Sequence, residues 1–338
     1  MLPEGYTARP ATLADAAGVA AVIASQQLAD FGAVQVSEAE VLADWAGSNL
    51  TADTVVIELA GSIRAAADLV DRPGLVSVYA YVHPEHTATG LGTFLAGWGE
   101  QRAATHGGPV VVRQHVVSTN RPAVSLLEQR GYQTRRAVLW MERELPAAAT
   151  AAGRVASPGA VRPARALPEG LTLRTYRGDV DEPAVHDAFE AASRDMNGRA
   201  VNTLEQWLDV ARTKDKELFF IVEDPTAQAA GTEVVGILIA SLGQAMSTQT
   251  TGAGAADSAP PAPPLGHVDS LRVAREWRRR GIGAALLATA FDALTERGAR
   301  SVGLSVDAAS PTGAPNLYLA AGMHVTRRYL VMELTVAG

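Results

Sequence analysis

Cysteine is absent from the 338 residues of this chain. Its absence excludes disulfide bonds, thiolate metal ligands and cysteine nucleophiles together. A chain without disulfide bonds is typical of a reducing compartment, so we expect a cytoplasmic protein.

Long apolar runs and clustered positive charge are also missing. No hydrophobic stretch reaches the roughly 18–20 residues that a membrane-spanning helix requires, so we expect no membrane span. The N-terminal segment MLPEGYTARPATLADA lacks the basic and apolar regions of a signal peptide. A formal net charge of -7 leaves no excess of cationic side chains for phosphates, so we expect no nucleic-acid partner. Lysine occurs only at Lys214 and Lys216, a scarcity that we attribute to genomic base composition.

The residues that are present suit ordinary folded domains. Hydrophobic residues make up 47% of the chain and charged residues 19%, which provides enough apolar surface for a core. A single core stops growing at roughly 250–300 residues, so the length of this chain favours two domains.

Two segments of the chain follow the same plan. The tetrapeptide LPEG opens one segment at position 2 and the other at position 167, which is 165 positions later. A Gly-x-Gly pair recurs at Gly90 and Gly281, 191 positions apart. The end motif at Gly131 recurs at Gly322 with the same spacing. The second copy therefore carries 26 additional residues, for which the low-complexity loop Met246–Pro264 is the obvious candidate.

The repeat predicts the domain boundaries. Pro146–Ala166 is rich in Pro, Ala and Gly and has the composition of a linker. We expect an N-terminal domain over residues 1–145, a linker over 146–166 and a C-terminal domain over 167–338.

Each copy alternates predicted strands with predicted helices, which indicates a mixed α/β sheet. Near the start of each copy we expect a helix, at Leu13–Gln27 and at Val180–Ser193. The later elements expected in the second copy are, in order, strands Leu218–Glu223, Val234–Ser241 and Val268–Val273, helix Ala284–Arg297, strand Ser301–Val306, a short helix near Pro315–Ala321 and strand Tyr329–Leu334.

The second Gly-x-Gly lies between a predicted strand and a predicted helix. This order places free N–H groups and the positive end of the helix dipole beside a turn that glycine opens. Three arginines precede Gly281, so the segment favours an anion, although a tight loop with a solvated basic run explains the same residues. A Walker A loop would continue with Lys-Ser/Thr, but Ala284-Ala285 follows Gly283. A dinucleotide fingerprint would need a third glycine where Leu286 stands.

Arg278, Gly281 and Gly283 match the Arg/Gln-x-x-Gly-x-Gly/Ala motif of the GCN5-related N-acetyltransferase (GNAT) superfamily, which the second copy resembles. The resemblance extends through Tyr318 to Gly322-Met323, with Met323 where an aromatic residue is usual. The tandem arrangement is similar to double-domain members of the mycothiol synthase type.

This resemblance implies two tandem GNAT domains, each a mixed, mostly antiparallel sheet flanked by helices. It implies acetyl-CoA as cosubstrate, a small-molecule amine as acceptor and no metal. By the family pattern, the preceding strand and the turn bind the cofactor through Leu271, Val273, Arg278, Arg279, Arg280, Gly281, Ile282, Gly283 and Ala284.

Two residues before the turn are candidates for the base that deprotonates the amine. Strand alternation would place His267 and Asp269 on one face, together with Leu271 and Val273. Histidine has an ordinary pKa near 6.5, which suits proton transfer at neutral pH. The alternatives are that Asp269 is the base, or that His267 is a solvated residue that follows a Pro-rich loop.

Tyr318 lies where the superfamily places its general acid, since a neutral phenol can donate a proton to the departing thiolate. The alternative is an ordinary core tyrosine.

The first copy lacks each of these groups. At a spacing of 191 residues, Val76 replaces His267 and Val78 replaces Asp269. Leu127 likewise replaces Tyr318, and Thr87 replaces Arg278. We therefore expect a catalytically degenerate N-terminal domain and a catalytic C-terminal one.

Four further residues have weaker signals. His83, His86 and His115 raise the question of a metal site, but solvated loop histidines explain them better. Asp195 lies where the superfamily binds its acceptor, although a helix-terminal turn is the simpler explanation.

The sequence thus predicts an acetyl-CoA-dependent N-acetyltransferase that acts on a primary amine by direct attack. One alternative is a mycothiol synthase-type amino-sugar conjugate acetyltransferase, although His267 stands where that enzyme has a glutamate. Another is a non-catalytic acyl-CoA-binding protein. The acceptor and the oligomeric state stay open.

Overall fold

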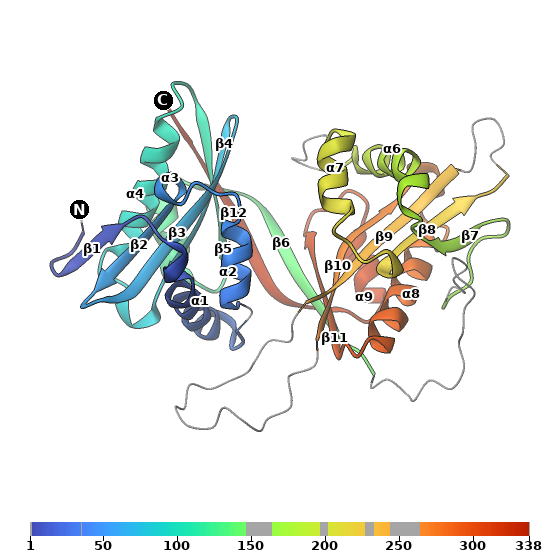
Figure 1. Ribbon diagram of the computed structural model, residues 1–338, viewed down its shortest axis with the longest axis horizontal. Coiled ribbons are helices and arrows are strands. Elements are labelled where there is room, and N and C mark those ends of the chain that lie inside the picture. The colour runs from blue at the N-terminus through green and yellow to red at the C-terminus, as the bar shows by residue number, and fades with distance from the viewer. Residues whose placement is uncertain are drawn as a thin grey trace. The chain divides into compact units, whose positions relative to one another are not determined.

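The computed structural model describes residues 2–34, 36–146, 164–196, 202–226, 233–243 and 264–337 (Figure 1). Most of the predicted linker and of the loop Met246–Pro264 lies outside these ranges. Among the helices in the described ranges, none combines the length and the apolar character that crossing a membrane requires.

The first copy contains, in order, β1 (Tyr6–Arg9), α1 (Ala16–Phe31), α2 (Glu38–Trp45), α3 (Leu50–Asp53), β2 (Thr54–Leu59), β3 (Ser62–Arg72), β4 (Leu75–Val82), α4 (Leu91–Ala104), β5 (Val110–Val117), α5 (Arg121–Gln129) and β6 (Gln133–Glu144). The second copy contains β7 (Thr172–Thr175), α6 (Glu182–Ser193), α7 (Leu204–Ala211), β8 (Phe219–Asp224), β9 (Glu233–Gly243), β10 (Leu265–Val273), α8 (Ile282–Glu296), β11 (Ser301–Asp307), α9 (Ala314–Ala320) and β12 (His324–Val336). Short 3-10 turns precede α1, α6 and β8 and follow β4 and β10.

The chain divides into two compact units that exchange their last strands. Unit 1 combines Met1–Leu139 with Arg327–Gly338, and unit 2 contains Trp140–Ala245 and Asp257–Thr326. Unit 1 therefore includes most of β12 from the second copy, and unit 2 includes the end of β6 from the first.

The strand order is equivalent in the two units. In unit 1 it is β1-β2-β3-β4-β5-β12, and in unit 2 it is β7-β8-β9-β10-β11-β6. The pairs β4–β5 and β10–β11 are parallel. The pairs β1–β2, β2–β3, β3–β4, β5–β12, β7–β8, β8–β9 and β9–β10 are antiparallel. The predicted mixed, mostly antiparallel sheet flanked by helices is confirmed.

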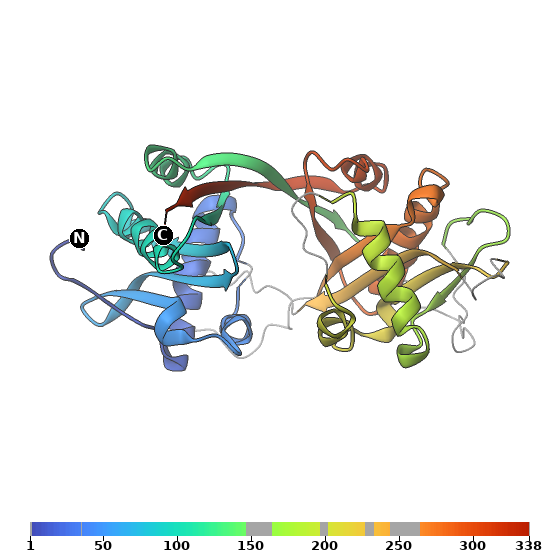
Figure 2. The ribbon, with the colours of Figure 1, turned by 90° about the horizontal axis from the view of Figure 1, so that it is seen from above.

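Helices cover both faces of each sheet, because the strands carry apolar side chains on both faces. In unit 1, helices α4 and α5 cover one face of the sheet, where the core includes Leu95 and Leu127. Helices α1 and α2 cover the other face, where the core includes Ile23 and Trp45. In unit 2, Trp207 of α7 packs with the α6 face, while α8 covers the other face, as Figure 2 shows. Each parallel pair of strands is thus enclosed on both sides.

Candidate active site

The turn between β10 and α8 has the backbone conformation of an anion-binding loop. Gly281 is the N-cap of α8 at φ +88°, and Arg279 also has a left-handed φ of +64°. Ala285 donates the first helical hydrogen bond, to the carbonyl of Gly281 at 3.0 Å. The preceding N–H groups, of Ile282, Gly283 and Ala284, therefore have no partner one helical turn back. Together with the helix dipole, they make this turn suitable for a phosphate.

The two glycines of the motif are required for different reasons. A Cβ at Gly281 would meet no atom within 4 Å, so the left-handed backbone is the reason for glycine there. A Cβ at Gly283 would lie 3.0 Å from Leu317 Cδ2, so this glycine lets α8 approach α9 closely.

The three arginines of the turn differ in their contacts. Arg278 donates to Asp195 Oδ2 at 2.5 Å and to the carbonyls of Ala192 and Val273, both at 3.1 Å. Its guanidinium therefore fastens the turn to the end of α6. Arg280 lies over the Trp277 ring at 4.8 Å, and Arg279 is exposed. A direct contact between these arginines and a cofactor stays a prediction.

Strand β10 has an open edge beside the turn. Its register with β11 ends at His267. Ala274 donates to Val235 of β9 at 2.9 Å, so the N–H and C=O groups of Leu271 and Val273 point to the opposite edge by alternation. That edge is where the sequence predicted backbone contacts to the cofactor, and these contacts stay a prediction.

A β-bulge in β10 changes which side chains share a face. The register with β9 shifts between Val268 and Ser270, so Asp269 is the additional residue. Leu271 and Val273 contact the Cβ position of Gly283 in α8, at 3.9 and 3.8 Å. Arg272 instead bonds Ser193 in α6 at 3.0 Å. The prediction that Leu271 and Val273 share a face with His267 and Asp269 was therefore wrong, because the bulge reverses the alternation.

The bulge brings four polar side chains together. His267 Nδ1 lies 2.6 Å from Asp269 Oδ1, and Ser241 donates to the same oxygen at 2.9 Å. Lys214 Nζ lies 2.9 Å from the other carboxylate oxygen, Oδ2. Sequence reasoning found His267 and Asp269 but missed Lys214, although lysine occurs only twice in the chain.

This cluster determines the protonation state of Asp269. Burial raises the pKa of the Asp269 carboxyl, but hydrogen bonds from His267 and Lys214 lower that pKa by a larger amount. The pKa of Asp269 therefore lies below its ordinary value. Asp269 is therefore a carboxylate at neutral pH and accepts the Nδ1 proton of His267. The other ring nitrogen of His267, Nε2, is left with a lone pair that can accept a proton.

Trp140 completes the surroundings of His267. The two rings stack at a centroid distance of 5.4 Å and an interplanar angle of 23°. Gly303 makes room for this indole, because a Cβ there would lie 2.8 Å from Trp140 Cζ2. Trp140 belongs to β6 in the first copy but to unit 2 in the structure. The sequence repeat assigns Trp140 to the first copy, so it offers no signal for this contact.

Tyr318 lies on α9 and is 7% exposed. Burial raises the pKa of its phenol, and Arg272 opposes that shift only in part. The phenol therefore stays neutral at physiological pH, as a proton donor requires.

In the first copy the residues 191 positions before His267, Asp269 and Tyr318 belong to the hydrophobic core. Val76, Val78 and Leu127 are buried at 0%, 1% and 3% exposure. The register of β3 with β4 is continuous, so β4 has no counterpart of the bulge residue Asp269, and Ser77 stands at the register position of His267. The turn itself is conserved, since Gly90 has φ +96° and Ala88 has φ +61°.

One weaker prediction concerns three histidines of the first copy. The donor atoms of His83, Glu85 and His86 lie within 4.8 Å of one another, and the His86 ring lies 2.7 Å from the Tyr6 hydroxyl. His115 stacks on Tyr79 instead. The absence of a metal stays a prediction.

Comparison with known proteins identifies the family. The profile of the acetyltransferase (GNAT) family matches residues 24–132 and 184–323. A GCN5-related N-acetyltransferase from Sphaerobacter thermophilus is 34% identical, with a TM-score of 0.79 over 100% of this chain and 98% of that one.

Two other structures share the fold at lower identity. A tandem GNAT protein from the clavulanic acid biosynthesis pathway is 15% identical, with a TM-score of 0.68 over 98% of this chain and 99% of that one. The Saccharomyces cerevisiae N-myristoyltransferase with bound myristoyl-CoA is 10% identical, with a TM-score of 0.63 over 100% and 80%. No curated protein matched the sequence. The family profile and the Sphaerobacter relative confirm the resemblance seen in the sequence, and the chain belongs to the acetyltransferase (GNAT) family as an N-acetyltransferase with tandem GNAT domains.

Proposed function

We propose that unit 2 alone carries out catalysis, transferring an acetyl group from acetyl-CoA to a primary amine of a small molecule by direct attack. The observation that carries this proposal is the His267–Asp269 pair at the bulge of β10, because β4 of the first copy has no bulge and contains neither histidine nor aspartate. The GNAT fold supports acetyl transfer from acetyl-CoA, and the polar cluster in unit 2 supports proton transfer beside it.

The residues of the turn fit the cosubstrate. The first-turn N–H groups of α8 and the exposed Arg279 suit a pyrophosphate. The open edge of β10 at Leu271 and Val273 offers backbone donors and acceptors to an amide-containing arm. Bound acetyl-CoA would supply the activated acetyl carbon and a thiolate leaving group.

The structure favours His267 over Asp269 as the base. Asp269 is a low-pKa carboxylate that three side chains occupy, which makes it a poor proton acceptor at neutral pH. It instead fixes the tautomer of His267 and stabilises the imidazolium that forms. His267 Nε2 then accepts the ammonium proton of the acceptor, directly or through a water molecule, and frees the nitrogen lone pair for attack.

Tyr318 is the proposed general acid. As the new N–C bond forms and the C–S bond breaks, its hydroxyl donates a proton to the departing sulfur. The raised pKa of the buried phenol keeps that proton in place before the step. The proton taken by His267 and the proton given by Tyr318 return through solvent exchange, so the step is balanced.

Release of free CoA across a panel of amines tests the proposal. The panel contains amino sugars, aminoglycosides, polyamines and peptide N-termini, and a thiol reagent detects CoA. Amine-dependent release that His267→Ala abolishes is the expected result. Acetyl-CoA binding without release for any amine would favour a non-catalytic acyl-CoA-binding protein. Selective turnover of an amino-sugar conjugate would favour the mycothiol synthase-type alternative.

A further inference from the structure

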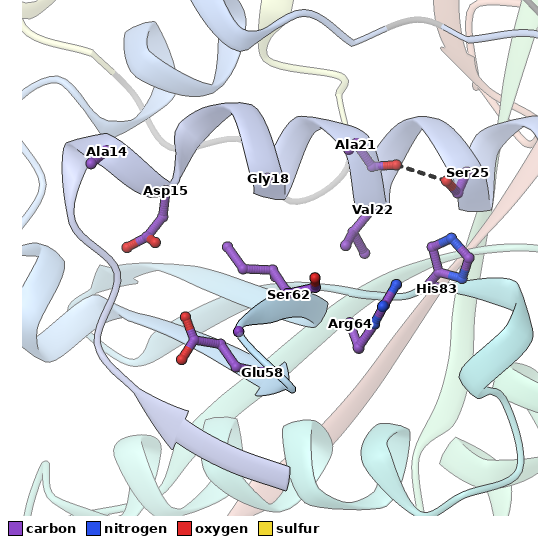
Figure 3. A pocket seen from close by; sticks show the side chains of 12 residues that line it. Ala14, Asp15, Gly18, Ala21, Val22, Ser25, Glu58, Ser62, Arg64 and His83 are labelled. Atoms are coloured by element: carbon purple, nitrogen blue, oxygen red, sulfur yellow. Dashed lines mark hydrogen bonds between the residues drawn. The ribbon is translucent and has the colours of Figure 1, made fainter. Parts of the chain in front are cut away.

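Unit 1 contains a cavity of about 400 Å³ between α1 and the start of β3 (Figure 3). This volume is in the range of small-molecule sites. Gly18, Ala21 and Val22 of α1 line one side. Figure 3 shows Arg64 and His83 at one end of the cavity and Asp15 and Glu58 at the other.

The end formed by Arg64 and His83 offers hydrogen-bond donors. Arg64 Nε is buried and has no hydrogen-bond partner in the part of the chain that the structure describes. His83 Nδ1 accepts from the N–H of Glu85 at 3.3 Å, so the neutral ring carries its proton on Nε2. A guanidinium and an imidazole N–H together suit an oxyanion.

The opposite end is negative. Arg9 bonds both Asp15, at 2.7 Å, and Glu58, at 2.6 Å. Two carboxylates share one guanidinium, so this end keeps one negative charge. It attracts a cationic group and repels a second anion.

The second copy shows which part of this arrangement is common scaffold. Arg174 bonds Asp181 and Glu223 in the same way as Arg9 bonds its two carboxylates, so that triad recurs in both units.

The end of the cavity formed by Arg64 and His83, in contrast, is particular to unit 1. His83 N–H donates to the carbonyl of Arg64 at 2.9 Å, and Ala274 N–H donates to the carbonyl of Val235 at the same distance. The two pairs are therefore equivalent in the fold. Val235 is 1% exposed, so an apolar residue meets the structural need at this position. A guanidinium whose buried Nε is unpaired adds a desolvation cost that packing does not explain.

We propose that this cavity binds a small zwitterion. Its carboxylate or other oxyanion accepts hydrogen bonds from Arg64 and His83, and its ammonium group lies toward Asp15 and Glu58. The first unit is then a ligand-binding module, independent of the transfer reaction assigned to unit 2.

Calorimetry on the full chain tests this site. The probes are ω-amino acids of increasing length, namely glycine, β-alanine, 4-aminobutyrate and 6-aminohexanoate. Acetate, inorganic phosphate, butylamine and glutarate are the one-charge and two-anion controls. We expect one ω-amino acid to bind with a Kd of about 1 mM or lower, and each control to bind at least about tenfold more weakly.

Arg64→Val installs the residue that the second copy carries at this position, and it should weaken binding at least about tenfold. Arg64→Gln keeps a polar side chain and is the second variant if Arg64→Val fails to fold. Arg121→Gln, at an exposed arginine of α5, is the matched control and should bind as the unaltered chain does. CoA release should be the same in all variants, which separates this site from the active site.

Three results would overturn the proposal. One is that none of the ω-amino acids binds at concentrations of up to about 10 mM. Another is equal affinity in Arg64→Val, or in Arg64→Gln where the valine variant does not fold. The third is that acetate, phosphate or glutarate binds as tightly as the best ω-amino acid. That result would show that the ammonium group of the ligand contributes nothing to recognition.

Discussion

At the scale of single residues, the chemistry depends on how Asp269 is held. A buried carboxylate is costly unless cations and hydrogen bonds compensate it. Here His267 and Ser241 contact one oxygen of the carboxylate and Lys214 the other. The arrangement reserves Asp269 for orienting the histidine, so Asp269 is a positioning residue for the base.

Lys214→Met tests this positioning. Without the ammonium, less opposes the burial that raises the pKa of Asp269, and the carboxylate that orients His267 loses the contact that fixes its other oxygen. We expect kcat to fall at least about tenfold, which corresponds to about 1.4 kcal/mol. The low-pH limb of the rate profile should also move to higher pH, because the His267–Asp269 pair then holds its proton without a neighbouring positive charge. Lys216→Met, at the other lysine, is the control, and an equal loss there would contradict the role of Lys214.

Tyr318→Phe removes one hydroxyl and preserves the packing of α9. If the phenol protonates the thiolate, kcat should fall by about 10²–10⁴. KM for acetyl-CoA should change little, because the lost interaction forms mainly in the transition state. Steady-state kinetics with the best amine measure both constants. Unchanged kcat would remove the general acid from the mechanism and leave the thiolate to depart unassisted.

At the scale of elements, the sequence predicts the order of strands and helices well. The predicted helix Ala284–Arg297 is α8 at Ile282–Glu296, and the predicted strand Ser301–Val306 is β11 at Ser301–Asp307. Periodicity and glycine placement determine such elements locally, so a single sequence suffices. The bulge at Asp269 depends on the pairing of β10 with β9 over a distant part of the chain. For that reason simple alternation placed Leu271 and Val273 on the wrong face.

Strand β3 contains a carboxyl group whose titration affects unit 1. Burial raises the pKa of Asp68 to about 7, with nearby Asp44 adding to the shift. The ordinary value is 3.8, so between these two values the folded state binds the proton more tightly than the unfolded state does.

The stabilising contribution of Asp68 is therefore fully present below its ordinary pKa and is lost as the pH rises through about 7. Chemical denaturation from about pH 5 to about pH 8 should show a steeper loss of stability in the unaltered chain than in Asp68→Asn, by at most about 1.4 kcal/mol per pH unit. Tyr79 and Tyr81 line the same region, and burial raises the pKa of both phenols, so neither titrates in this window. If the free energy of unfolding changed equally with pH in the two proteins, the raised pKa of Asp68 would be contradicted.

At the scale of the whole molecule, the tandem repeat is visible in the sequence but the exchange of last strands is not. The repeat spacing assigns β6 to the first copy, while the residues of β6 from Trp140 onward belong to unit 2. Trp140 reaches His267 only through this exchange. The limits 1–145 and 167–338 describe the repeat, and the assignment of catalysis to the second copy stays a proposal.

Two equivalent glycines allow the most direct test of that assignment. Gly281 and Gly90 cap equivalent helices with left-handed φ values of +88° and +96°, so aspartate at either position imposes a similar backbone strain. In Gly281→Asp the new carboxylate would also face the proposed phosphate site. The measurement is amine-dependent CoA release by the full chain, with acetyl-CoA binding followed by calorimetry. We predict that Gly281→Asp loses acetyl-CoA binding at the active site and nearly all turnover, while Gly90→Asp retains kcat within about threefold once folding is verified. Loss of turnover in Gly90→Asp with full activity in Gly281→Asp would contradict the account.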